Sequence, residues 1–237
     1  MRKFDLHVHS MYSYDSLMEP RKIIKIAKKR GLNGIAITDH GTILGGLSAR
    51  KCNASDLIII IGAEIKTDIG DIIGLFLNEE ITSKEIWCVI DEIRDQDGLV
   101  ILPHPFRGHY LNGFDKDLFE KIDAIEGYNA RTGKNENIQA QEYAKIHKLP
   151  IIAGSDAHFY GEIGLAKTII KDISSEEDIR KSILTHDTYI EGVQTHLYFK
   201  GASRILTDIK TGNWYRLPYT LLKMTIKGIR MYANKNK

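Results

Sequence analysis

Short apolar runs alternate with longer amphipathic stretches along most of the chain. The apolar runs have the length of strands, and we interpret the following as strands: 4–9, 34–39, 57–64, 71–77, 99–103, 124–128, 150–153, 166–170 and 188–191. Stretches with helical spacing predict helices at 19–30, 83–95, 116–121, 135–147 and 175–184. This alternation predicts an α/β fold built from repeated β–α units.

The arrangement of these units favours a compact barrel over an open sheet. Residues 57–64, LIIIIGAE, form a nearly continuous apolar run, which is typical of a strand buried on both faces. A count of about seven or eight strands suits a β/α barrel, and 237 residues fit one such domain. No glycine-rich phosphate loop follows any of the predicted strands, which weakens the alternative of an open nucleotide-binding sheet.

Charge divides the chain unevenly, although the net charge is only +2. Residues 1–191 contain 24 Lys and Arg against 30 Asp and Glu, whereas residues 192–237 contain 9 against 1. The stretch after Pro218 predicts a helix with Lys223, Lys227 and Arg230 close together on one face. Three interpretations of this extension stay open: a helix packed on the barrel or on a second copy of the chain, a membrane-surface anchor, and electrostatic capture of RNA.

The two cysteines and the N-terminal residues bear on the compartment. Cys52 and Cys88 form no CxxC pair, so the sequence predicts neither a disulfide framework nor a thiolate zinc site. The start of the chain lacks the pattern of a signal peptide, and no apolar run approaches the roughly 18 residues that a membrane span needs. We expect a cytoplasmic protein, with any membrane association made through the C-terminal tail.

Histidines and carboxylates stand where the predicted strands end. They are His7, His9, Asp39, His40, Glu64, His104, Asp156 and His158. In a parallel barrel the carboxyl ends of the strands open onto one rim, so these side chains are expected to converge. A lone histidine at a strand end is more often structural, and a lone aspartate after a strand is usually a helix cap. The whole set, however, predicts metal binding, because only cations would neutralise so many carboxylates among imidazoles.

The remaining histidines of the predicted helices and loops, His147, His186 and His196, are expected to be solvated.

The ordered motifs DLHVHS, YSYDS, AITDH, GAE, LPHP and GSDAH resemble the PHP (polymerase and histidinol phosphatase) family. The resemblance covers residues 1–191, leaving residues 192–237 as a basic, helical extension. It implies a distorted TIM-like (β/α)7 barrel with three metals at its C-terminal rim. It also implies the ligands: His7, His9, Glu64 and Asp156 for the first metal; Glu64 and His104 for the second; Asp15, His40 and His158 for the third.

One position departs from the family pattern. The family usually has a further ligand, often histidine, after the strand that here contains AIEGYNAR. This chain offers Asn129, with Glu126 as the weaker substitute. Because an amide oxygen binds metals less well than an imidazole, we expect the second metal to be held more loosely.

The family resemblance implies a metal-dependent phosphoesterase that uses two to three divalent ions, Mn, Fe or Zn. A hydroxide bridging two metals at Glu64 and Asp156 would attack phosphorus, and the metals would neutralise the developing charge. Arg107 and Arg131 follow ligand strands and are candidate phosphate clamps, with ordinary surface arginines as the alternative. His109, in a glycine-containing segment that could act as a lid, is a candidate general acid, and a metal-bound water is the stronger alternative for that role.

The substrate class implied by the resemblance is a phosphorylated small molecule, a nucleotide or the end of an oligonucleotide. The short interval between Glu64 and His104 leaves no room for a large covering insertion and favours an open site. The oligomeric state is left open. Two other functions are considered: a hydrolase of cyclic amides or esters, which would need a carbamylated lysine such as Lys66, and a degenerate metal-binding module with a regulatory or scaffolding role, which only Asn129 supports.

Overall fold

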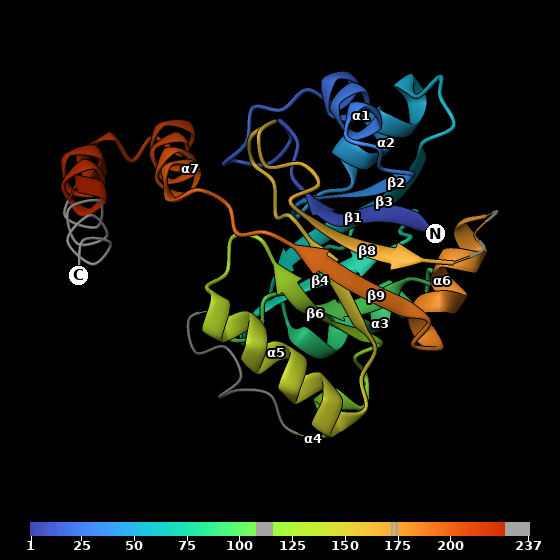
Figure 1. Ribbon diagram of the computed structural model, residues 1–237. Helices are drawn as coiled ribbons and strands as arrows, with labels where there is room; N and C mark the ends of the chain where they lie inside the picture. Colours follow the sequence, from blue (N-terminus) through green and yellow to red (C-terminus); the bar gives the residue numbers. More distant parts are fainter. Residues whose placement is uncertain (108–115, 172, 174, 226–237) are drawn as a thin grey trace, which may run out of the picture.

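The computed structural model describes residues 1–107, 116–171, 173 and 175–225. Their strands form one sheet that curls into a nearly closed barrel, with the order β7-β6-β5-β4-β3-β2-β1-β8-β9 (Figure 1). A parallel bridge between Val8 and Ala157 brings the end of β1 beside the segment after β7. The expected distorted barrel is confirmed, and the open doubly wound sheet is excluded.

The strands agree with the predicted apolar runs to within a few residues. They are β1 Arg2–Val8, β2 Gly34–His40, β3 Ile58–Lys66, β4 Asp71–Leu75, β5 Leu99–Leu102, β6 Ala124–Asn129, β7 Ile151–Gly154, β8 Ala166–Ile170 and β9 Thr188–Gly192. In β3 the consecutive Ile59, Ile60 and Ile61 are all buried, as a strand covered on both faces requires.

The direction of the strands decides which ends meet at the rim. β1, β2 and β3 pair in parallel, and so do β5, β6 and β7. β4 lies between the two groups and is antiparallel to both of its neighbours, and β8 is antiparallel to β1. The amino end of β4 therefore lies at the same rim as the carboxyl ends of the six parallel strands.

Helices pack around the barrel on several sides. They are α1 Pro20–Lys29, α2 Leu44–Cys52, α3 Ile86–Arg94, α4 Lys116–Phe119, α5 Lys134–His147 and α6 Glu176–Leu184. α1 begins with Pro20 at its first turn, and Gly31, just after its end, has a φ of 71° that other residues rarely adopt. Its apolar stripe, Ile23, Ile24 and Ala27, is buried in one core cluster with strand residues such as Ile35. Figure 1 shows α1 and α2 on one side of the barrel and α5 on the other.

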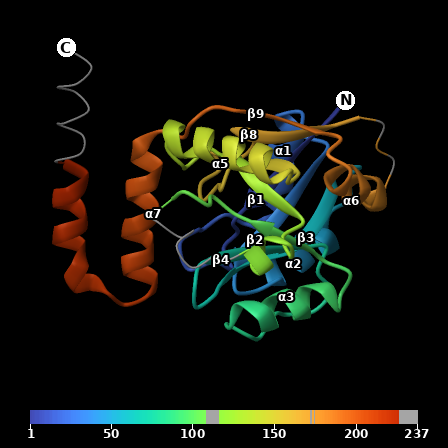
Figure 2. The same cartoon turned by 90° about the horizontal axis from the view of Figure 1, so that it is seen from below.

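The end of the chain forms a pair of helices that we call the C-terminal arm, residues 197–225. It consists of α7 Leu197–Lys210, the 3-10 turn η2 Trp214–Arg216, and a helix over residues 217–225. Figure 2 shows these two helices side by side at one flank of the barrel. Thr220 Oγ1 donates to Asp208 Oδ2 at 2.7 Å and ties them together. The predicted basic face is only partly described, because Lys227 and Arg230 lie outside the described residues.

No helix within these described ranges has both the length and the apolar character needed to cross a membrane.

Candidate metal centre

Eight of the predicted ligands lie together at one rim of the barrel. They are His7, His9, Asp15, His40, Glu64, His104, Asp156 and His158. Seven of them are buried, and His40 is half-buried. Each stands on a strand end or on the loop that follows it, so the barrel topology brings residues from distant parts of the sequence to one place.

The centre of the cluster lies between β1, β3 and the segment after β7. His7 Nε2 and His9 Nε2 are 3.1 Å apart, and Glu64 Oε2 lies 3.4 Å and 3.3 Å from them. Asp156 Oδ1 is 3.3 Å from His9 Nε2 and 3.7 Å from His7 Nε2. Two imidazoles and two carboxylates thus direct their ligand atoms at a common point.

Two further groups of ligand atoms border this one. Asp15 Oδ2 is 2.6 Å from His158 Nε2 and 3.3 Å from His40 Nε2. The other oxygen of Glu64, Oε1, is 2.9 Å from His104 Nε2. In each of three groups (His9, Asp15, His40 and His158; His7, His9 and Asp156; Glu64, Asp71 and His104), all ligand atoms lie within 4.8 Å of one another.

Asp71 is a candidate ligand that the sequence analysis missed. It is the first residue of β4 and pairs with Lys66 at the end of β3. Attention to the carboxyl ends of parallel strands alone overlooks the amino end of an antiparallel strand, which lies at the same rim. The signal available in the sequence was a carboxylate at the start of the extra strand 71–77.

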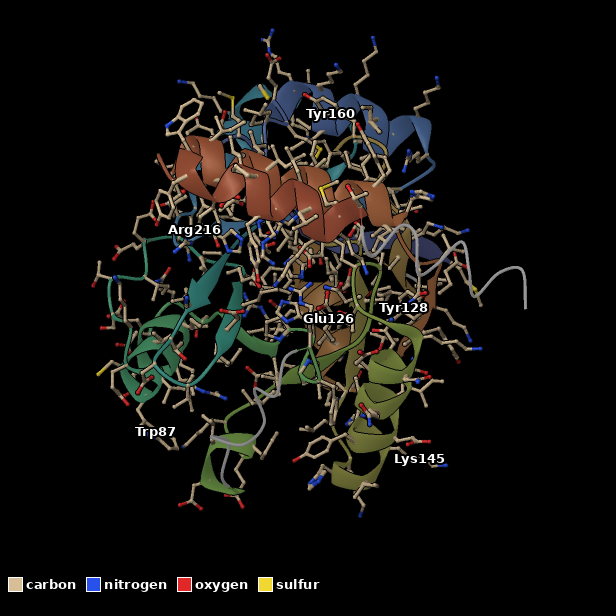
Figure 3. All side chains as sticks on the ribbon, turned by 90° about the vertical axis from the view of Figure 1, so that its left-hand side faces the viewer. Trp87, Glu126, Tyr128, Lys145, Tyr160 and Arg216 are labelled. Carbon is tan, nitrogen blue, oxygen red and sulfur yellow. The ribbon has the colours of Figure 1, made fainter. Side chains whose placement is uncertain are left out.

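Glu126 is the second residue whose role the sequence analysis did not anticipate. It is buried in the middle of the barrel on β6 (Figure 3). Its Oε1 lies 3.0 Å from His7 Nδ1, and its Oε2 accepts from the backbone N–H of His104 at 2.9 Å. A carboxylate behind a ligand imidazole fixes the ring and the tautomer, and leaves Nε2 free as a metal ligand.

The chemistry of these donors fits metal ions. His158 Nδ1 donates to the carbonyl of Asp156 at 2.8 Å, so its Nε2, like that of His7, is left as an acceptor facing carboxylates and other imidazoles. Within the described part of the chain, Asp15 Oδ1 and His104 Nδ1 are buried without any hydrogen-bond partner. Acceptors that crowd one another in a buried space are satisfied together when a cation lies among them.

The electrostatics of the metal-free cluster support the same conclusion. Burial opposes the protonation of His9, but hydrogen bonds to Asp156 and Glu64 overcome it and raise the pKa of His9 to about 9. Burial would raise the pKa of Glu64, yet the imidazoles of His40 and His7 hold it well below its usual range. Glu64 therefore stays ionised and attracts positive charge, which protons supply when metals do not.

Two of the ligand residues adopt backbone conformations that are uncommon for residues other than glycine. Asp156 has φ of 54° and His104 has φ of 29°. The backbone N–H of Asp156 donates to His7 O at 2.8 Å, which holds the turn against β1. Such strain is typical of positions where the surrounding structure fixes a functional side chain.

Comparison with known proteins decides the family. Residues 5–196 match the family model of the PHP domain. The chain belongs to the PHP domain family. The region that matches contains all of the candidate ligands and ends just before the C-terminal arm.

Relatives of this PHP domain occur among curated sequences and solved structures. An uncharacterized protein of Methanocaldococcus jannaschii, MJ1587, is 40% identical over 159 residues, which cover 60% of this chain and 92% of that protein. A two-domain Bacteroides vulgatus protein, described as containing a predicted PHP-like metal-dependent phosphoesterase, matches with a TM-score of 0.71 and 18% identity over 85% of this chain and 68% of that chain. PsfC of Pseudomonas syringae matches with a TM-score of 0.65 and 18% identity over 92% of this chain and 98% of that chain. At 18% identity, these two solved structures support the fold of this chain and not its activity.

The two predicted phosphate clamps differ in this PHP domain. Arg107 Nη1 lies 2.6 Å from Asp156 Oδ2, so its guanidinium is at the cluster, and its side chain is 38% exposed. Arg131 is directed elsewhere: its guanidinium binds Ser203 Oγ and Phe199 O of α7 and lies 3.6 Å from Glu162 Oε2. These contacts direct Arg131 toward the arm, and its expected role as a phosphate clamp stays a prediction.

Asn129 makes different contacts from those expected of a ligand. Its Oδ1 accepts from the backbone N–H of Arg131 at 2.8 Å. Its Nδ2 donates to Glu126 Oε2 at 3.0 Å and to Asp156 Oδ2 at 3.2 Å. Because the backbone N–H fixes which end of the amide is the oxygen, Asn129 presents a donor to the cluster and supports its carboxylates.

Three other predicted residues complete the comparison. Asp39, the residue before the last of β2, is fully buried and accepts hydrogen bonds from Ser10 and Ser13, so it holds the loop after β1 in place. Lys66 is exposed at the end of β3. His109 lies outside the described residues.

A cleft of about 450 Å³ opens beside the cluster. Its lining includes the ligand candidates His40, Glu64 and Asp71, the ring of Tyr14, and the lysines Lys66 and Lys84. Tyr14 stacks on His40 with ring centroids 4.5 Å apart and an interplanar angle of 10°. The cleft therefore joins a metal-ligand cluster to a surface with an aromatic ring and positive charge.

Proposed function

We propose that the protein is a metal-dependent phosphoesterase. The observation that carries the proposal is the convergence of His7, His9, Glu64 and Asp156 on one buried point, bordered by two further ligand groups. Membership of the PHP domain family and the fold shared with a protein described as a predicted PHP-like metal-dependent phosphoesterase support it. The three groups favour two to three divalent ions, with imidazole and carboxylate ligands suited to Mn, Fe or Zn.

The residues of the site divide the work of phosphate ester hydrolysis. Bound divalent ions supply Lewis-acid charge and an activated water at neutral pH. Glu64 joins two of the groups, because Oε2 faces His7 and His9 while Oε1 faces His104. Glu126 orients His7 from behind. Arg107 contacts Asp156 at the cluster and is partly exposed, which supports a role for it in binding a phosphate oxygen of the substrate.

The cleft beside the cluster supports a nucleotide, an oligonucleotide end or another small phosphomonoester as substrate. Its volume of about 450 Å³ is within the range of small-molecule sites. Tyr14, a residue that is 45% exposed, lines the cleft, and Lys66 and Lys84 supply positive charge for further anionic groups. Lys66 is exposed and Glu64 fills the joining position, which weighs against chemistry through a carbamylated Lys66.

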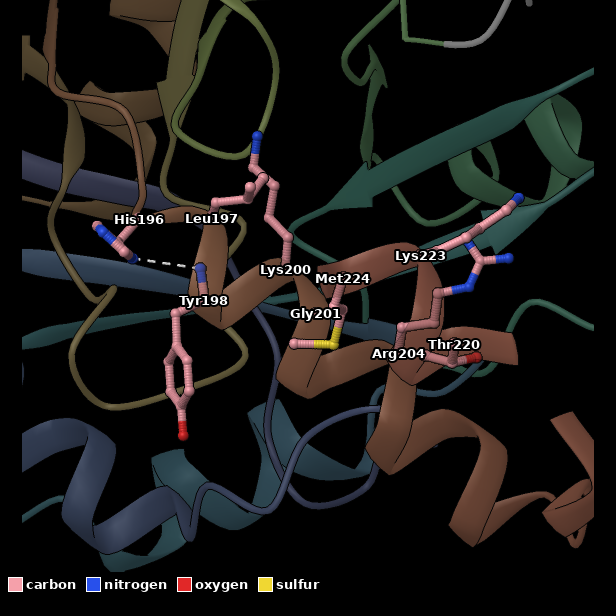
Figure 4. A pocket seen from close by; sticks show the side chains of 9 residues that line it. All are labelled: His196, Leu197, Tyr198, Lys200, Gly201, Arg204, Thr220, Lys223 and Met224. Carbon is pink, nitrogen blue, oxygen red and sulfur yellow. Dashed lines mark hydrogen bonds between the residues drawn. The ribbon is translucent and has the colours of Figure 1, made fainter. Parts of the chain in front are cut away.

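The C-terminal arm supports a second, weaker contact with an anionic polymer such as RNA. A cleft of about 420 Å³ between its two helices is lined by Lys200, Arg204 and Lys223 together with Tyr198 (Figure 4). Trp214 and Tyr215 are exposed nearby in the sequence, at 62% and 73%. Positive charge interleaved with aromatic rings is typical of surfaces that bind single-stranded nucleic acid.

The test is an assay of the purified, metal-reconstituted chain with an aryl phosphomonoester, followed by nucleotides and short oligonucleotides. We expect hydrolysis by the wild type and its loss in Asp156→Ala. Asp91→Asn, on the exposed face of α3, is the matched control and should retain full activity. Metal-loaded wild type that hydrolyses none of these esters would contradict the proposal and favour a regulatory metal-binding module.

A further inference from the structure

One lysine of the C-terminal arm binds the loop that carries a candidate metal ligand. Lys210 ends α7 and lies outside residues 5–196, which match the PHP domain. Its Nζ donates to three backbone carbonyls, Met11 O at 3.2 Å, Ser13 O at 2.6 Å and Ser16 O at 3.1 Å. A lysine ammonium has three N–H donors, so this set of carbonyls uses all of them.

The loop bound by Lys210, residues 10–18, carries Asp15 and Tyr14. Asp15 Oδ2 contacts His158 and His40, and Tyr14 stacks on His40 at the mouth of the cleft. Inside the barrel, the Ser13 hydroxyl lies 3.1 Å from His9 Nδ1 and 2.8 Å from Asp39 Oδ1. The loop is therefore held from within by serine contacts and from outside by Lys210.

A second set of contacts ties α7 to the loop that carries His158. Arg131 binds Ser203 Oγ and Phe199 O on α7 and lies 3.6 Å from Glu162 Oε2. The same Oε2 accepts from the backbone N–H of His158 at 3.0 Å. The ring of Phe199 also packs against Phe159, with centroids 5.6 Å apart. Asp15 and His158, which share a 2.6 Å contact, thus stand on two loops that α7 holds together.

We propose that Lys210 is a positioning residue for the metal site formed by His9, Asp15, His40 and His158. It fixes the loop backbone so that Asp15 meets the imidazoles, and it makes the arm part of the metal centre. The inference rests on the proposed metal site and extends it to a segment beyond the PHP match. The ligands of the other two groups, such as His7 and His104, stand on strand ends that Lys210 does not contact.

The experiment measures Mn²⁺ binding, without reference to activity. The full chain is stripped with a chelator and titrated with Mn²⁺ by calorimetry, and the unfolding temperature of the metal-free protein is recorded. We expect Lys210→Met to weaken one class of Mn²⁺ site by about 10-fold or more, as for other residues that orient metal ligands, and to leave the remaining sites unchanged. Lys210→Arg keeps several donors and should restore most of the affinity.

Two variants separate positioning from general loosening. Arg216→Met removes a positive charge from an exposed position of the arm and should bind Mn²⁺ as the wild type does. Ser203→Ala weakens the contact of α7 with Arg131 but keeps Lys210, and it should lose less affinity than Lys210→Met. An equal loss in Ser203→Ala, or wild-type Mn²⁺ binding by Lys210→Met whatever its unfolding temperature, would overturn the role of Lys210. Metal-loaded protein without hydrolytic activity would count against the phosphoesterase alone.

Discussion

The rim of the barrel and the C-terminal arm show two ways in which one chain arranges charge. At the rim, most of the carboxylates and imidazoles are buried, and the carboxylates contact the imidazoles, as Glu64 contacts His7, His9 and His104. On the arm, Lys200, Arg204 and Lys223 surround an open cleft instead of packing into a core. Buried charges need close partners, whereas exposed charges act through their field. The buried cluster at the rim suits metal binding at a defined site, whereas the exposed cleft of the arm suits weak binding of an extended anion.

The largest effect is expected where one residue joins two ligand groups. Glu64→Gln keeps the shape of the side chain but removes its negative charge, so activity on a phosphomonoester should fall by about 10³-fold. Steady-state kinetics and metal content measure the loss. The exposed Glu79→Gln is the control. Near-normal turnover by Glu64→Gln would show that the joining carboxylate is dispensable.

A smaller effect is expected behind the ligands. Glu126→Gln leaves His7 with a neutral partner, so metal affinity or activity should fall by about 10- to 100-fold. A metal titration beside the exposed Glu120→Gln checks this. If Glu126→Gln bound metal as tightly as the wild type, the orienting role assigned to this buried carboxylate would be wrong.

Metal affinity should depend on pH in a stated direction. Hydrogen bonds to Asp156 and Glu64 raise the pKa of His9 to about 9 in the metal-free protein, so a proton is bound at neutral pH and a metal must displace it. Affinity should therefore rise between pH 6 and about 9, by roughly tenfold per pH unit for each proton released. Calorimetry in buffers of different ionisation enthalpy counts the protons. Affinity that falls as pH rises through this range would contradict the charge balance described for the rim.

The smallest effect on catalysis is expected from the arm cleft. Replacing both Arg204 and Lys223 with serine should leave hydrolysis of a small ester unchanged. It should weaken binding of single-stranded RNA and reduce the slope of log K against log salt by about 0.7 for each phosphate that is no longer neutralised. A fluorescence titration at several salt concentrations gives both values. RNA binding that is unaffected, or a weakening of binding to anionic vesicles alone, would exclude this surface as an RNA site.

The sequence predicted the parts of the rim that repeat a simple rule. His7, His40, Glu64 and Asp156 each follow or end an apolar run, and parallel strands bring such positions together. Asp71 was missed because it begins an antiparallel strand, a direction that no local pattern encodes. The contacts of Arg131 were missed for a related reason: its partner Ser203 lies 72 residues away on a helix whose docking the sequence did not reveal.

The sequence also did not reveal the residues that hold the candidate ligands in place. Glu126 stands within the apolar strand β6, and only its distance of 3.0 Å from His7 Nδ1 shows what it does. Lys210 resembles any other lysine of a basic tail until its ammonium is found among three carbonyls. Residues that bind metals can be inferred from their type and spacing, but residues that orient them depend on tertiary geometry.

The central claim is that the rim is a metal centre, and elemental analysis of the purified chain tests it most directly. Protein reconstituted with Mn²⁺, Fe²⁺ or Zn²⁺ and passed through a desalting column should retain about two to three ions per chain, and Glu64→Gln should retain fewer. Folded wild-type protein that retains no metal above background after reconstitution would contradict the account.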